Sequence, residues 1–115
     1  MVLLSKPVSV PDLARIEEVT YFEDWIKCVA DINQGTMAVN ASMHADLEEF
    51  LLQQGSDQSS LYGFNIYFDP FEIEYDSLIN APRNREAGYP RDGRGVADPA
   101  VRIRIEEIVN KWIQS

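Results

Sequence analysis

The chain has 115 residues, of which 45% are hydrophobic and 25% charged, a balance typical of one globular domain spanning residues 1–115. Its formal net charge of −9 disfavours nucleic acid as a partner, because such binding depends on neutralising phosphates. A single cysteine excludes an intrachain disulfide, and no apolar run suits a signal peptide or a membrane span. We therefore expect a cytoplasmic protein with no membrane partner.

The first forty residues predict a strand, a helix and a hairpin. A short strand occupies residues 2–5, and Ser9 has the position of the cap of a helix over 9–18. Apolar residues then alternate over 25–32 and 36–41. This alternation predicts two strands joined by a tight turn.

A second helix and a second hairpin follow. Ser42 is the expected cap of a helix over 42–55, and Met43 begins the apolar stripe that this helix turns inward. Alternation over 61–68 and 72–80 predicts two further strands with a turn between them.

A long connection rich in Pro, Gly and Arg occupies residues 81–98, and a helix capped by Asp98 runs from there to residue 112. Loops of this length in compact domains are commonly functional. The order of elements predicts an α+β fold. We expect a mainly antiparallel four- or five-stranded sheet from two β-hairpins, with three helices packed on one face.

If each hairpin turns its apolar side to the helices, polar side chains gather on the opposite side of the sheet. Asn and Asp are depleted in strands, so their presence there indicates a ligand-binding face or a dimer interface, with a solvated sheet face as the alternative. The candidate ligand-binding residues on this face are Lys27, Asp31, Asn65, Asp76 and Asn80, with Tyr67 beside them.

Charge is distributed unevenly along the chain. Residues 1–80 carry 14 Asp and Glu against 3 Lys and Arg, whereas residues 81–115 carry 5 against 7. The basic residues of the second part include Arg83, Arg85, Arg91, Arg94, Arg102 and Arg104. Arginine suits carboxylates and phosphates, so the cluster either pairs with the protein's own carboxylates or holds an external anion. Arg94 is the ligand-binding candidate within it.

His44 is the single histidine and lies at the expected start of the second helix. A helix start can bind an anion and lower the pKa of a histidine, so His44 could act as a general base, with Asp46 or Asp76 orienting it. A capping or surface histidine is the other interpretation. One histidine and one cysteine disfavour a zinc site. A carboxylate Mg²⁺ site of Asp31, Asp46 or Asp76 is conceivable but has no diagnostic spacing, so the sequence predicts no metal site and no cofactor.

Five short motifs make the chain resemble a small bacterial family, common in cyanobacteria, that is known only as a domain of unknown function. The motifs are His44-Ala45-Asp46, Gly55-Ser56, Gly63-x-Asn65-x-Tyr67, Asp76-Ser77-Leu78-Ile79-Asn80 and Arg94-Gly95-Val96-x-Asp98-Pro99. The resemblance covers nearly the whole chain and implies a small stand-alone cytoplasmic protein without an assigned activity. The chain departs from the family pattern between residues 80 and 94.

These observations favour a small binding module, expected to be a homodimer, that holds an anionic small molecule or a protein partner with its polar sheet face and arginine loop. One alternative is a small hydrolase or nuclease that uses His44, a carboxylate and Arg94, which requires His44 and Arg94 to share one cleft. The other is an interaction protein of the toxin–antitoxin kind. It would show a contiguous exposed apolar patch and no well-formed pocket.

Overall fold

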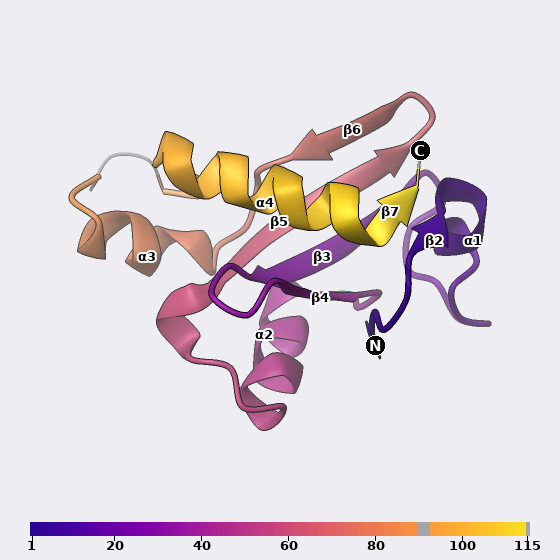
Figure 1. Cartoon of the computed structure of the whole chain (residues 1–115), viewed down its shortest axis with the longest axis horizontal. Coiled ribbons are helices and arrows are strands. Elements are labelled where there is room, and N and C mark those ends of the chain that lie inside the picture. The colour runs from indigo at the N-terminus through magenta and orange to yellow at the C-terminus, as the bar shows by residue number, and fades with distance from the viewer. Residues whose placement is uncertain (90–92, 115) are drawn as a thin grey trace.

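A computed structural model describes residues 1–89 and 93–114, and Figure 1 shows helices packed around a central sheet. The neighbouring strands of this five-stranded sheet are antiparallel, in the order β1 (Val2–Leu3), β4 (Thr36–Val39), β3 (Trp25–Asp31), β5 (Leu61–Phe68) and β6 (Phe71–Glu74). A short parallel pair joins β2 (Val8–Ser9) to β7 (Ile113–Gln114). The predicted α+β class and the mainly antiparallel sheet are confirmed.

The helices are α1 (Val10–Ala14), α2 (His44–Gln53), α3 (Asn80–Glu86) and α4 (Pro99–Trp112), with a 3₁₀ turn η1 (Gln58–Ser60) before β5. The predicted caps of the first and last helices are confirmed. Ser9 accepts a hydrogen bond from the backbone N–H of Asp12, and Asp98 accepts one from that of Ala100. Every helix within the described residues is too short or too polar to cross a membrane.

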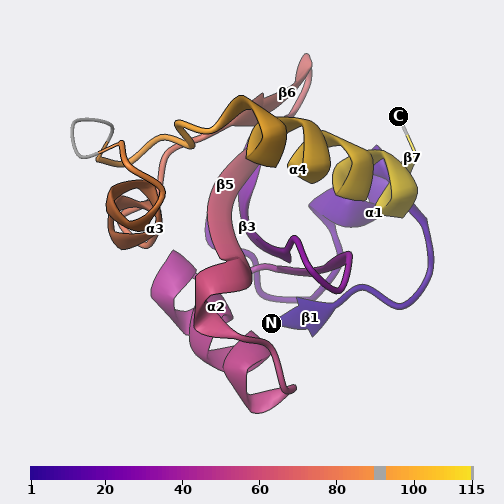
Figure 2. The same cartoon turned by 60° about the vertical axis from the view of Figure 1, so that its left-hand side comes forward.

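Helices cover both faces of the sheet, which corrects the expectation that three helices pack on one face (Figure 2). Cys28 of β3 belongs to the hydrophobic cluster that contains Ile105 of α4, whereas the next residue, Val29, belongs to the cluster that contains Leu47 of α2. Successive strand residues point to opposite faces, so β3 buries apolar side chains on both sides. Val29 stands on the face that the alternation had assigned to polar residues.

The predicted strand over 72–80 is wrong in its second half. The strand β6 ends at Glu74, and a turn then leads into α3, inside the segment expected to be a loop. Pro82 favoured the loop interpretation, but it lies in the first turn of α3, where the missing N–H of proline has no helical partner to lose. Asn80 is therefore the first residue of a helix and not the last of a strand.

The start of α2 also differs from the expectation. The cap residue is Met43, not Ser42, and no side chain caps the first turn of the helix. Met43 is exposed rather than turned into the core. The backbone N–H of Asp46 bonds the carbonyl oxygen of Met43, and no side chain accepts a hydrogen bond from the first turn.

Candidate functional site

A hollow of about 170 Å³ opens beside the uncapped start of α2, between β3 and the turn that precedes α3. The residues that line it are Lys27, Ser42, Met43, His44, Ala45, Ser77, Leu78, Ile79 and Arg94. Two of them are cationic, and none of the described lining residues is a carboxylate. We call this hollow the basic pocket. It contrasts with a second hollow on the other side of α2, which Asp46 and Glu49 line.

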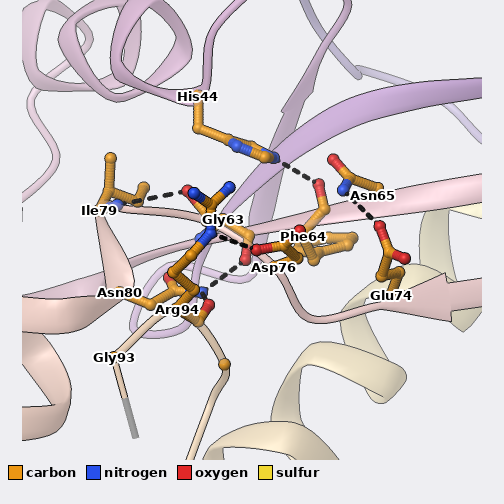
Figure 3. Close-up of polar contacts among 12 residues, drawn as sticks. His44, Gly63, Phe64, Asn65, Glu74, Asp76, Ile79, Asn80, Gly93 and Arg94 are labelled. Atoms are coloured by element: carbon orange, nitrogen blue, oxygen red, sulfur yellow. Dashed lines mark hydrogen bonds and ion pairs between the residues drawn. The ribbon is translucent and has the colours of Figure 1, made fainter.

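The imidazole of His44 forms one wall of the basic pocket and is buried. Its Nε2 donates a hydrogen bond to the carbonyl oxygen of Phe64 at 2.9 Å, which leaves Nδ1 as the nitrogen with a free lone pair (Figure 3). Burial is the main cause that lowers the pKa of His44 from its ordinary value. The contact with the Phe64 carbonyl raises this pKa, whereas the charge of Lys27 lowers it further. His44 is therefore a neutral imidazole at neutral pH.

Gly63 allows His44 and Ser77 to approach the sheet closely. A Cβ at residue 63 would lie 2.5 Å from Ser77 Oγ and 3.1 Å from His44 Cδ2. These separations leave no room for a side chain, so glycine is required for this packing. The motif residues Gly63, His44 and Ser77 thus meet at one point under the pocket.

Asn80 fixes the turn that carries Arg94. Its side chain bonds both backbone groups of Gly63 and donates a further hydrogen bond to the carbonyl oxygen of Arg94 at 3.1 Å. The same carbonyl accepts a bond from the backbone N–H of Ser77 at 2.9 Å. Asn80 is fully buried, so it positions the pocket and does not line it.

The two cations of the basic pocket differ in their pairing. The guanidinium Nε of Arg94 donates to Asp76 Oδ1 at 2.5 Å, in an ion pair whose side chains are both about half exposed (Figure 3). Lys27 makes no ion pair with any described residue and lies instead against the rings of Phe22 and Trp25. Burial lowers the pKa of Lys27, although the charge of Asp76 opposes this effect.

The remaining predicted site residues lie around the pocket or away from it. Asn65 is buried and donates to Glu74, while its Oδ1 has no hydrogen-bond partner within residues 1–89 and 93–114. The Asn65 side chain also raises the pKa of His44.

Asp31 organises the β3–β4 turn at the other end of its strand, where it accepts bonds from two backbone N–H groups and from Ser56. Neither Asp46 nor Asp76 hydrogen-bonds His44 in the described structure.

Most of the described arginines bind the protein itself. Arg83 pairs with Glu48, Arg102 donates to the carbonyl of Val96, and Arg104 donates to the carbonyl of Ile32. Arg85 is exposed, and Arg91 lies outside the described residues. Of the arginines that the structure describes, Arg94 alone lines the basic pocket.

Sequence reasoning missed the apolar side of the pocket. Met43 was assigned to the core, and Leu78 and Ile79 were assigned to a strand. Leu78 is one of the most exposed large apolar residues of the described chain. The Asp76-Ser77 pair, typical of turns and helix starts, was the available signal that the strand had ended.

Comparison with known proteins gives a family but no activity. The sequence from residue 2 to residue 112 matches the family described as Protein of unknown function (DUF5674), so the chain belongs to this family. No curated protein and no solved structure matches the chain.

Proposed function

We propose that this member of the DUF5674 family is a binding module whose basic pocket holds a small anionic ligand. One observation carries the proposal: Lys27 and Arg94 line a pocket to which no described carboxylate contributes, in a chain whose net charge is −9. With 19 acidic side chains against 10 basic ones, a purely acidic or mixed lining would be expected by chance.

The state of Lys27 supports an external partner. A partly buried ammonium without a direct ion pair has lost hydration, and the more distant charges of Asp76 and Glu74 offset that loss only in part. An anion in the basic pocket would supply a direct counter-charge and would raise the pKa of Lys27 again. The ammonium rests on the Trp25 ring, 4.9 Å from its centroid, which holds it in place.

The start of α2 adds a second source of positive potential. His44 and Ala45 line the basic pocket at the first turn of a helix of ten residues, and no side chain caps this turn. Backbone N–H groups and the helix dipole favour an anion at such a position. Ser42 does not cap the helix as predicted, and an uncapped helix start can receive a ligand.

Arg94 can exchange its partner, since its ion pair with Asp76 is solvent-exposed and contributes little to stability. The backbone of Arg94 is held separately, by Ser77 and Asn80. Arg94→Ala should therefore weaken ligand binding and leave the fold intact. Asp76→Asn should strengthen the binding of anions, because it removes the carboxylate that competes for the guanidinium.

The experiment is thermal unfolding with inorganic phosphate, pyrophosphate, acetate and citrate. A ligand at about 100 times its dissociation constant adds about 2.7 kcal/mol, which is on the order of 10 °C in melting temperature. Stabilisation of the wild type should be lost in Lys27→Gln and retained in Lys6→Gln, a matched change of charge at an exposed lysine outside the pocket. Equal stabilisation of both variants, or none of the wild type, contradicts the proposal.

A second candidate function is hydrolysis of the bound anion with His44 as general base. The specific observation in its favour is that His44 and Arg94 line the same pocket, and that Nε2 of His44 is already committed to Phe64. The test is product release from p-nitrophenyl phosphate and p-nitrophenyl acetate. Turnover that His44→Gln abolishes, with phosphate binding retained, supports this function, and turnover unchanged in that variant contradicts it.

A further inference from the structure

Three aromatic side chains next to the basic pocket stack on one another. The rings of Phe22 and Trp25 are 3.9 Å apart with planes 19° from parallel, and those of Trp25 and Tyr67 are 5.8 Å apart with planes 22° from parallel. We call these three residues the aromatic ladder. All three side chains are half-buried, so the ladder reaches the surface.

The aromatic ladder is not part of the hydrophobic core. Neither hydrophobic cluster of the described residues includes any of its three rings, even among the partly buried residues packed against a cluster. Other aromatic side chains do belong there, namely Phe50, Tyr62, Phe64, Phe68, Phe71, Tyr75 and Trp112. Filling the core therefore does not explain why Trp25 and Tyr67 of the sheet stack with Phe22 of the preceding loop.

Lys27 joins the ladder to the basic pocket. Its ammonium lies 4.9 Å from the centroid of Trp25 and 5.3 Å from that of Phe22, and the same side chain lines the pocket. Trp25 of β3 lies opposite Tyr67 of β5, and Lys27 lies opposite Asn65, two residues further along the same face of the sheet. Two residues of a strand span about 7 Å, so the rings and the cationic pocket are close neighbours.

We propose that the anion is a nucleoside phosphate, with its phosphate in the basic pocket and its base stacked on an outer ring of the aromatic ladder, since Phe22 and Tyr67 both stack on Trp25. This inference rests on the proposed function and names the ligand class. A base is joined to its phosphate through one sugar, and Lys27 lies beside two rings of the ladder, so neighbouring side chains would hold the two ends of such a ligand. Every base has a π face, so stacking on aromatic side chains tolerates different bases. We expect AMP and CMP to bind with similar affinity.

The test compares AMP, CMP, ribose 5-phosphate, inorganic phosphate and adenosine by calorimetry and by tryptophan fluorescence. The chain has two tryptophans, so Trp112→Phe leaves Trp25 as the single tryptophan. AMP and CMP should bind at least tenfold more tightly than ribose 5-phosphate and should quench Trp25. Ribose 5-phosphate should bind without quenching. In Tyr67→Leu the affinity for AMP should fall to that for ribose 5-phosphate, which itself should change less than threefold, because the described ring contacts of Lys27 are with Phe22 and Trp25.

The outcomes separate this inference from the proposed function. If ribose 5-phosphate binds as tightly as AMP and neither quenches Trp25, the ladder takes no part and the nucleotide inference fails, while the anion pocket stands. If adenosine binds as tightly as AMP, the coupling of ladder and pocket is wrong. If no phosphate compound binds, the nucleotide inference fails, and the anion proposal fails with it only if acetate and citrate do not bind either. Should Tyr67→Leu not fold, quenching in the Trp112→Phe protein and the affinity of Phe22→Leu for AMP decide the matter.

Discussion

The side chain of Asn80 hydrogen-bonds both backbone groups of Gly63 at the edge of β5. The backbone N–H of Gly63 donates to Asn80 Oδ1 and the Gly63 carbonyl accepts from Asn80 Nδ2, both at 2.8 Å. The strand β6 pairs with β5 only from Asn65 onwards, so Gly63 has no strand partner on this side. A single amide side chain thus takes the place of a strand residue and connects the start of α3 to the sheet.

Asn80→Ala should reduce the free energy of unfolding by on the order of 3 kcal/mol, because it leaves both Gly63 backbone groups buried without a partner. Urea denaturation measures the loss. The matched control is Asn110→Ala, at an exposed position of α4, which should change stability by less than about 0.5 kcal/mol. Similar values for the two variants would show that water replaces the Asn80 amide.

Gly63→Ala should destabilise the protein by about 1–3 kcal/mol, since the new methyl group would lie 2.5 Å from Ser77 Oγ and force the turn or the imidazole of His44 to move. The same variant should weaken ligand binding in the basic pocket. Gly93→Ala is the matched control, because a Cβ there meets no atom of the described residues within 4 Å. Differential scanning calorimetry compares the two, and an unaltered melting temperature in Gly63→Ala would contradict the packing argument.

Arg83 belongs to the arginine-rich segment, but its contacts are structural. It pairs with Glu48 in a nearly buried ion pair and donates to the carbonyl oxygens of Gln58 and Ile79. Arg83→Ala should cost about 3–5 kcal/mol, because the carboxylate would be left buried and unpaired. Exposed Arg85→Ala should cost less than about 0.5 kcal/mol.

A double variant separates pairing from packing at this site. Replacing Arg83 by Met together with Glu48 by Leu should restore part of the stability lost in Arg83→Ala, since no charge is then left buried. Chemical denaturation of the two variants gives the comparison. A double variant no more stable than Arg83→Ala would mean that the unpaired Glu48 carboxylate costs little, since both variants lose the carbonyl contacts of Arg83.

The titration of His44 provides a prediction on pH. Because burial lowers the pKa of His44 below its ordinary 6.5, the folded protein binds fewer protons than the unfolded chain as the pH falls through that value. As the pH falls below 6.5, the free energy of unfolding should therefore decrease more in the wild type than in His44→Gln. Above pH 6.5 the difference between the two proteins should not change with pH. The single histidine makes the NMR titration direct, and a midpoint at or above 6.5 would contradict the prediction.

Added phosphate offers a control on the same resonance. An anion beside His44 favours the charged imidazolium, so saturating phosphate should raise the midpoint in wild type. In Lys27→Gln the midpoint should no longer respond to phosphate. A response that persists there would place the anion elsewhere.

The sequence by itself determined the local elements whose pattern is strong. The alternation over β3, β4 and β5 and the stripe of α4 predicted these elements, and Ser9 and Asp98 predicted two helix starts, because local propensity and tertiary packing agree there. The α+β class followed from their order. Lys27, His44 and Arg94 were selected as candidates from residue type and position alone.

Only the tertiary structure decided that these three residues share a pocket. Val29 is buried against α2 on the face expected to be polar, and this packing places the start of α2 over the sheet. The change from strand to helix at Asn80 depends on hydrogen bonds to Gly63, which lies 17 residues earlier in the chain. Short-range patterns carry no information on such contacts, so the sequence could select the residues but not bring them together.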